Sequence, residues 1–190
     1  PSRYANLDTD IISIDSYLTN RREKKPVTMV LDDDSCMIEP SRVLRKPFGT
    51  WLAGNNTPNH VREPSAEEQE AQTYGSVIQG VCGIWYFYGV PHEKLHWQAY
   101  VRLNKELLSL QDVLFSEDVA ADIPSDMQSV MATTRRRQGK TYLITCNVVD
   151  KPVTATFKLP AGVKQAEVLF ENRRIDVRDG ILRDAYDGYK

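Results

Sequence analysis

The sequence has no long apolar run and no excess of one charge. Its 24 basic and 26 acidic residues give a formal charge of -2, which removes the electrostatic case for nucleic acid or an anionic membrane as partner. The longest apolar stretches, such as Val81 to Tyr88, are far shorter than the roughly 20 residues that a membrane span needs. We therefore expect a globular chain with neither nucleic acid nor membrane as partner.

The sequence also lacks paired cysteines and metal-binding motifs. Its three cysteines are far apart and show no C-x-x-C spacing, which argues against zinc and against a redox pair. The three histidines likewise have no partner at metal-ligand spacing. We expect no metal and no cofactor, with cysteines that are free thiols: Cys36, Cys82 and Cys146.

The printed sequence begins at Pro1, with neither an initiator methionine nor a signal peptide. We expect a processed, excised or truncated chain on this basis. The sequence does not determine the cellular compartment, and it is compatible with a secreted or periplasmic location.

The first half of the chain has the pattern of a parallel α/β fold. Three continuous apolar runs, Asp10–Asp15, Pro26–Asp32 and Val81–Tyr88, are typical of strands buried on both faces. Ser65 and Glu68 form a capping box that predicts a helix to about Gln79, and leucines at helical spacing predict a second helix from Leu95 to Leu110. Strands that alternate with helices indicate βαβ units.

The second half changes to the two-residue period of antiparallel strands. Apolar and polar residues alternate in Tyr142–Val148 and in Val153–Leu159. Turn signals such as Gln138-Gly139 and Asp179-Gly180 separate the expected strands. This pattern predicts a small β-sandwich over 128–190, joined by a linker at 116–127 to an α/β domain over 1–115. Its other strands are expected at 130–134, 167–170, 173–177 and 181–184.

The first half is too short for a complete barrel. A (β/α)₈ barrel needs about 250 residues, and the first 110 residues supply about three units. A free-standing three-stranded sheet would leave a long exposed edge. We therefore expect the last three βα units of a TIM-type barrel.

The order of these segments resembles a known family. Asp10-Ile-Ile-Ser-Ile-Asp-Ser-Tyr17, Lys25-Pro-Val-Thr-Met-Val-Leu31 and the segment from Arg62 through Tyr74 to Tyr88 are similar to the end of glycoside hydrolase barrels of the β-galactosidase and cellulase-like type. The resemblance implies strands six, seven and eight, followed by a β-sandwich. It also implies a carbohydrate substrate and, as partner, the missing amino-terminal barrel portion, whose strand four would hold the general acid/base. Because glycosidic hydrolysis normally uses two carboxyl groups, we expect the chain alone to be inactive.

Candidate site residues follow from the rule that barrel active sites lie at the carboxyl ends of strands. The family nucleophile is usually a glutamate at the end of strand seven, and here Asp32 or Asp33 takes that place, although adjacent acids in a loop also occur as solvated or turn-capping groups. Asp15 is a candidate for hydrogen bonding to a sugar hydroxyl, with loop support as the alternative. The other candidate substrate contacts are Tyr17, Trp51, Trp85 and Tyr86, since sugar faces stack on aromatic rings.

Trp51 lies in a stretch from Ser35 to Pro64 that we expect to be one long functional loop. Trp85 and Tyr86 are neighbours on a strand, so one of the pair should point inward. The sequence therefore predicts part of an enzyme that cleaves glycosidic bonds in oligo- or polysaccharides. The alternative is a non-catalytic carbohydrate-binding or scaffold module.

Overall fold

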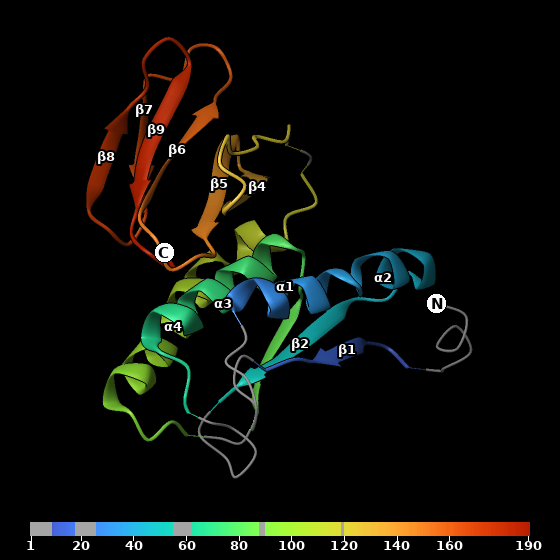
Figure 1. Ribbon diagram of the computed structural model, residues 1–190. Coiled ribbons are helices and arrows are strands. Elements are labelled where there is room, and N and C mark those ends of the chain that lie inside the picture. The colour runs from blue at the N-terminus through green and yellow to red at the C-terminus, as the bar shows by residue number, and fades with distance from the viewer. Residues whose placement is uncertain (1–8, 18–25, 55–61, 88–89, 119) are drawn as a thin grey trace. The chain divides into compact units, whose positions relative to one another are not determined.

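The computed structural model describes residues 9–17, 26–54, 62–87, 90–118 and 120–190. The chain divides into two compact units, Pro1–Tyr100 and Val101–Lys190. The first is a mixed α/β unit, and the second carries antiparallel sheets (Figure 1). The linker expected at 116–127 stays a prediction.

A three-stranded parallel sheet forms the centre of the first unit. Its strands are β1 (Ile12–Asp15), β2 (Phe48–Ala53) and β3 (Gly83–Phe87), in the spatial order β1-β2-β3. Both neighbouring pairs are parallel. This confirms the parallel arrangement and a strand within each of two predicted ranges, 10–15 and 81–88, although residue 88 lies outside the described residues.

The described residues form four helices: α1 (Val27–Ser35), α2 (Ile38–Leu44), α3 (Ala66–Ile78) and α4 (Lys94–Leu114). The expected helices after Ser65 and from Leu95 are confirmed as α3 and α4. Ser65 caps α3 as predicted, because its side chain accepts from the Glu68 amide at 3.1 Å while the Glu68 carboxylate accepts from the Ser65 amide at 2.9 Å. α4 begins in the first unit and ends in the second.

The strand predicted at Pro26–Asp32 is wrong, because this segment forms helix α1. Its buried residues are Val27, Val30, Leu31 and Asp34, and this i, i+3, i+4, i+7 spacing puts all four on one helix face. The middle strand is instead Phe48–Ala53, inside the stretch expected to be a long loop. The run of apolar residues was short enough to fit either element.

Helices α1 and α4 contact the same face of the sheet. Ser16, directly after β1, donates to Asp33 of α1 at 2.7 Å, and the Tyr86 ring on β3 stacks on Tyr100 of α4 with centroids 4.0 Å apart. Tyr100 also donates to the Ala53 carbonyl at 2.9 Å. α1 and α3 lie on the same side of the sheet in Figure 1. Because side chains alternate along a strand, the intervening residues belong to the other face.

The second unit contains six strands in three antiparallel pairs: β4 (Val130–Arg137) with β5 (Lys140–Asn147), β6 (Val153–Lys158) with β9 (Ile181–Tyr186), and β7 (Gln165–Val168) with β8 (Arg173–Asp176). The six predicted strands are therefore confirmed, although the fourth lies two residues earlier than expected. Gln138 and Gly139 join β4 to β5 with φ values of 51° and 75°, as a two-residue type I′ turn requires. The sandwich itself stays a prediction.

One apolar core holds the strand pairs of this unit together. Its buried members are Ile123, Val130, Ala155, Phe157, Leu182 and Tyr186. Partly buried side chains from β5, β7 and β8 pack against it: Leu143, Ala166 and Ile175. The buried Asn147 amide donates to the carbonyls of Lys151 and Asp187, each at 2.8 Å. The core therefore draws on all three strand pairs.

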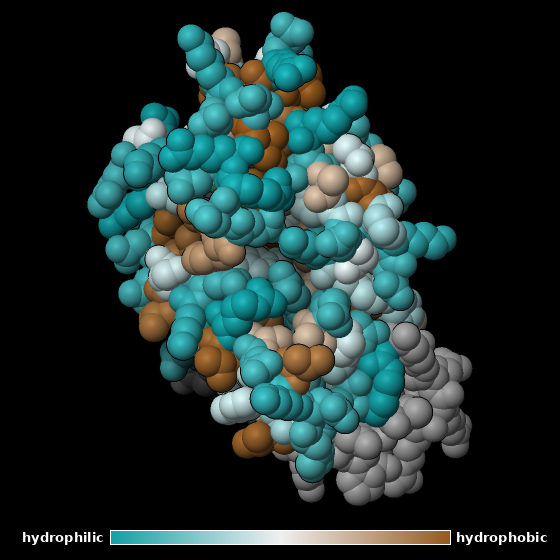
Figure 2. Space-filling model, turned by 90° about the vertical axis from the view of Figure 1, so that its left-hand side faces the viewer, coloured by the Kyte–Doolittle hydropathy of each residue, from teal (hydrophilic) through white to brown (hydrophobic). Residues whose placement is uncertain are grey.

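The visible surface is mostly hydrophilic. In Figure 2 the apolar patches are interrupted by hydrophilic side chains, in line with the 26% of charged residues in the sequence. Among the described helices, none has the length and apolar character to cross a membrane.

Candidate functional site

The sheet face away from the helices carries three candidate residues in one row. Asp15 on β1 is in register with Trp51 on β2, and Trp51 is in register with Trp85 on β3. Residues in register on parallel neighbours project from the same face. The structure thus brings together three of the residues predicted to contact substrate, which we call the Asp15–Trp51–Trp85 row.

The two tryptophans of this row form one aromatic surface. Their ring centroids lie 5.4 Å apart with an interplanar angle of 24°. The indole of Trp85 lies over Gly49 and Gly83, because a Cβ atom at Gly49 would come within 2.1 Å of its Cζ3 atom and one at Gly83 within 2.9 Å of its Cη2 atom. The glycines provide the space that this ring occupies.

A second aromatic pair continues this face toward the carboxyl ends of the strands. The rings of Tyr17 and Phe87 lie with centroids 5.2 Å apart. Burial raises the pKa of the Tyr17 hydroxyl, and hydrogen bonding to and charge from Asp15 raise it further. Asp15 itself is exposed. The face therefore presents a carboxylate and four aromatic rings, of which Tyr17 also carries a hydroxyl.

Tyr86 lies on the opposite face, where its ring stacks on Tyr100. Trp85 lies on the sheet face away from α4, and the expectation that one member of the pair points into a barrel stays a prediction. Because α4 covers Tyr86, its predicted substrate contact has no support from its position.

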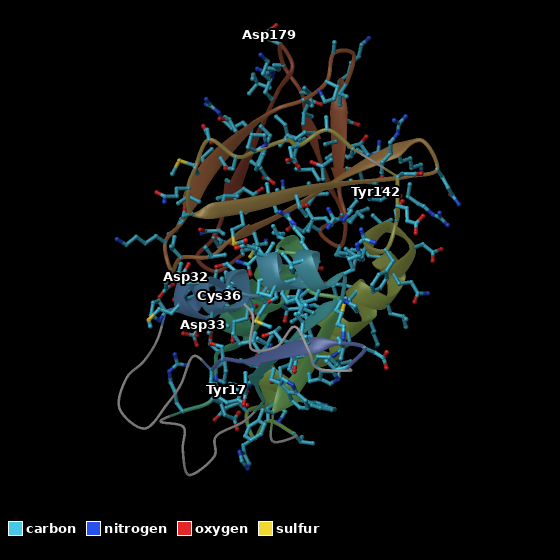
Figure 3. The ribbon with its side chains drawn as sticks, turned by 90° about the vertical axis from the view of Figure 1, so that its right-hand side faces the viewer. Tyr17, Asp32, Asp33, Cys36, Tyr142 and Asp179 are labelled. Carbon is cyan, nitrogen blue, oxygen red and sulfur yellow. The ribbon has the colours of Figure 1, made fainter. Side chains whose placement is uncertain are left out.

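Asp32 and Asp33 do not end a strand, as the sequence prediction required, but lie in α1 (Figure 3). Asp32 is exposed, whereas Asp33 accepts from the Ser16 hydroxyl. Asp34 is fully buried and accepts from Ser76 on α3 at 2.6 Å. Burial raises the pKa of Asp34. This group of acids thus ties α1 to the end of β1 and to α3, and its placement gives no support to a nucleophile at Asp32 or Asp33.

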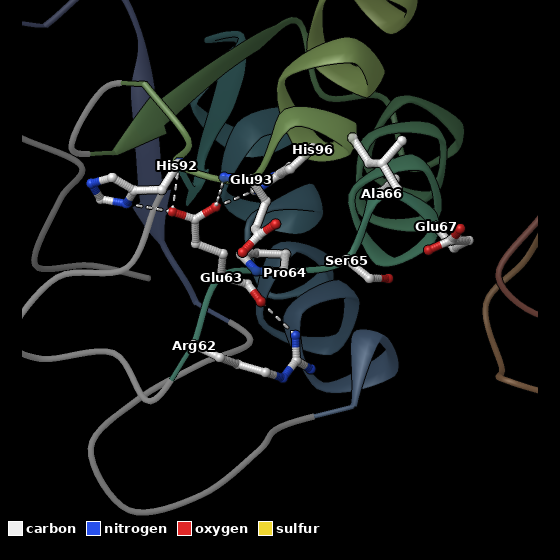
Figure 4. A pocket seen from close by; sticks show the side chains of 10 residues that line it. Arg62, Glu63, Pro64, Ser65, Ala66, Glu67, His92, Glu93 and His96 are labelled. Atoms are coloured by element: carbon white, nitrogen blue, oxygen red, sulfur yellow. Dashed lines mark hydrogen bonds and ion pairs between the residues drawn. The ribbon is translucent and has the colours of Figure 1, made fainter.

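A polar pocket of about 640 Å³ lies between the segments that lead into α3 and α4 (Figure 4). Glu63 is its central group. One carboxylate oxygen accepts from the amide of His92 at 2.8 Å and lies 2.7 Å from the Nδ1 atom of its ring. The other accepts from the Glu93 amide at 3.1 Å. Glu63 thereby fixes the segment before α4 to the segment before α3.

Two further interactions involve residues that line the pocket, His96 and Arg62. The buried His96 ring places its Nδ1 atom 3.5 Å from Glu63, and burial lowers the pKa of His96 against the opposing effect of that carboxylate. Arg62 donates through both terminal nitrogens to Glu68, each at 2.7 Å. Glu63 was not among the residues predicted from the sequence. The sequence signal that could have identified Glu63 was its position two residues before Ser65, the first residue of the capping box.

Among the described residues, the carboxylates near these segments differ in their surroundings. Asp15 is the carboxylate in register with the tryptophans, whereas Glu63 is engaged by backbone amides and histidine. Within the described ranges, no three His, Cys, Asp or Glu side chains are grouped so that they could hold a metal ion.

Comparisons with known proteins give only distant likenesses. No protein-family model matches the sequence, and a search of curated proteins found no match. An Anoxybacillus alpha-amylase, described as a new glycosyl hydrolase subclass, shares 15% identity at a TM-score of 0.48, over 85% of this chain and 44% of that one. The endo-beta-1,4-mannanase of Thermotoga petrophila shares 11% identity at a TM-score of 0.34, over 96% of this chain and 42% of the mannanase. The chain thus spans less than half the length of either structure, and at this distance the likeness does not assign it to a family.

Proposed function

We propose that the chain is the carboxy-terminal part of a glycoside hydrolase barrel and that it binds carbohydrate through the Asp15–Trp51–Trp85 row. The observation that carries the proposal is this row on the sheet face away from the helices. Flat indole rings offer apolar surface to the C–H faces of a sugar, while a carboxylate accepts hydrogen bonds from its hydroxyls.

The arrangement of the first unit supports a place in a barrel. In a (β/α)₈ barrel, helices cover the outside of a parallel sheet and the other face points into the barrel. β1 to β3 are parallel, and helices α1 and α4 contact the same face of the sheet. Further βα units of a parent chain would extend the sheet at β1 or β3 and enclose the aromatic face.

Hydrolysis would need a second carboxyl group beside the aromatic face. A glycosidase normally uses one acid to protonate the leaving oxygen and another as nucleophile or base. Asp15 supplies one carboxylate in register with the tryptophans. We therefore expect the chain alone to bind a sugar without cleaving it, with the second acid on the parent's other strands.

Tryptophan fluorescence provides the test. A Trp97→Phe background removes the exposed indole on α4, so that the remaining emission comes from Trp51 and Trp85. Titration with neutral oligosaccharides of the glucose and mannose series should give a saturable change, and aryl glycosides should stay intact. Trp85→Ala in the same background should abolish the response. A flat titration across the whole panel would reject the carbohydrate site.

The alternative is a non-catalytic carbohydrate-binding module, favoured by the fact that, among the described strands, Asp15 is the single carboxylate in register with the two tryptophans. Assays of the full-length parent chain distinguish the hydrolase from the binding module. Turnover of a glycoside by the full-length parent, lost in the Asp15→Asn variant, supports the hydrolase. Sugar binding by the parent without turnover supports the module.

A further inference from the structure

A cationic face lies at the tip of the β4–β5 hairpin, in the second unit. Arg135 is in register with Tyr142, and Arg137 is in register with Lys140. Alternate residues of a strand and their partners in register share a face. The four side chains therefore mark the corners of one patch, about 7 Å along the strands and about 5 Å across.

These cations are not neutralised by neighbouring acids. Arg137 and Lys140 are exposed, and neither forms an ion pair with a carboxylate in the described part of the chain. Arg135 uses one guanidinium nitrogen to donate to the Thr133 hydroxyl at 2.8 Å, which orients its side chain along the strand. Arg136 points to the other face, and its carbonyl accepts from Ser116, close to Glu117 and Asp118.

The hairpin holds the patch in a fixed geometry. The type I′ turn at Gln138 and Gly139 closes the strands in continuous register, with eight paired positions from Val130 to Arg137. The core face of the same hairpin is anchored by Val130 and Leu143. Since the strands are already paired, binding requires little further ordering of the backbone.

We propose that Arg135, Arg137, Lys140 and Tyr142 bind a carboxylate-bearing polysaccharide. The inference rests on the proposed carbohydrate function and names the chemical class of the polymer. Guanidinium groups pair with carboxylates through two parallel hydrogen bonds, and a tyrosine ring can stack on the sugar that carries the acid. A polymer with one carboxylate per sugar would offer charges to several of these cations at once. The proposed carbohydrate function favours a polysaccharide over nucleic acid, which is the other polyanion that the test below includes.

The test compares two forms of one polymer. Labelled polygalacturonate oligomers and the same oligomers after full methyl esterification differ only in the carboxylate charge. Fluorescence anisotropy with the 190-residue chain at low ionic strength should show saturable binding of the acidic form and none of the ester. The Arg137→Gln/Lys140→Gln variant should bind the acidic form about tenfold or more weakly.

A matched variant controls for net charge. Lys164→Gln/Arg178→Gln removes the same two charge types from exposed positions elsewhere in the second unit and should bind as the unaltered chain does. Arg137→Lys keeps the positive charge but removes the planar guanidinium group. If Arg137 holds a carboxylate through two hydrogen bonds, this variant should bind less tightly than the unaltered chain. Tyr142→Phe preserves the ring and should retain binding.

The proposal would be overturned by equal binding of the ester, by equal loss in both double variants, or by equally tight binding of single-stranded DNA of matched charge. Failure of the underlying carbohydrate function is seen separately. Trp85→Ala abolishes the response to neutral sugars but leaves polygalacturonate binding unchanged if the hairpin acts alone. Loss of polygalacturonate binding in Trp85→Ala would place the acidic polymer on the sheet and overturn the assignment to the hairpin.

Discussion

Trp51 and Trp85 lie in register on adjacent parallel strands, with their rings stacked at 5.4 Å, because Gly49 and Gly83 leave room for the Trp85 indole. The position of the Trp85 ring thus depends on the absence of a side chain at both glycines. A side chain at either glycine acts on the aromatic face without adding or removing a polar group.

Gly49→Ala should therefore displace Trp85. The new methyl group would lie 2.1 Å from the indole and 2.8 Å from the Gly83 carbonyl oxygen, and overpacking of this kind costs about 1–3 kcal/mol of unfolding free energy. Chemical denaturation and the emission of the Trp97→Phe background measure the two effects. Gly83→Ala, at 2.9 Å, should cause a smaller loss. Trp85→Ala should suppress the part of the Gly49→Ala penalty that comes from the indole, while the contact with the Gly83 carbonyl oxygen remains. Fully additive losses would contradict a clash with Trp85.

Asp34→Asn should change how stability depends on pH. Burial raises the pKa of Asp34 in the folded state, so the folded protein binds this proton more tightly than the unfolded chain does. The free energy of unfolding should then fall as pH rises from the ordinary range of an aspartate through the raised pKa. The asparagine amide carries no charge, and its oxygen can still accept from Ser76. The variant should therefore lose this decline and be more stable at neutral pH.

Denaturation at a series of pH values checks the Asp34 prediction. Asp32→Asn is the matched control, because Asp32 is exposed on the same helix and its loss should leave the pH profile unchanged. If the free energy of unfolding of Asp34→Asn falls with pH as steeply as that of the unaltered chain, the decline comes from another group.

Ser65→Ala should destabilise α3. The Ser65 hydroxyl accepts from the Glu68 amide at the first turn, and loss of such a cap costs about 1 kcal/mol. Ser65→Thr keeps the acceptor and should stay close to the unaltered chain in thermal and chemical unfolding. Equal stability of the Ala and Thr variants would show that the capping bond contributes nothing.

Glu63→Gln should loosen the segment before α4. An amide offers one oxygen where the carboxylate offers two, so the amides of His92 and Glu93 cannot both keep an acceptor in the observed geometry. Hydrogen exchange of these two amides should accelerate. Glu67→Gln, which lies in the same pocket and is exposed, should leave their exchange unchanged. Unaltered exchange in Glu63→Gln would mean that other contacts hold the segment.

Most elements were predictable from local pattern, but the middle strand was not. α3 was readable because the capping box and the helical spacing agree, and the second-unit strands because their alternation is regular. The apolar run from Val27 to Leu31 fitted a strand by composition, while its buried positions recur at helical intervals. Phe48–Ala53 contains two small residues, Gly49 and Ala53, and therefore gave a weak strand signal.

The candidate site was predictable in its residue types rather than its contacts. Trp51 and Trp85 were expected to contact substrate, yet their register depends on a strand that the sequence did not reveal. The candidate catalytic role of Asp32 and Asp33 rested on the strand predicted at Pro26–Asp32. Because that segment is helix α1, the two residues do not lie at the end of a strand. Glu63 acts through amides of a segment some thirty residues away, a relationship that spacing along the chain does not encode.

The course of α4 affects any attempt to divide the protein. The boundary between Tyr100 and Val101 falls within the helix Lys94–Leu114, so cleavage there would leave each half with a helix end whose backbone groups had lost their partners. The amino-terminal piece would retain Tyr100, which stacks on Tyr86, but only the first third of the helix that carries it. A fragment designed to contain either unit alone should therefore include the whole of α4, Lys94–Leu114.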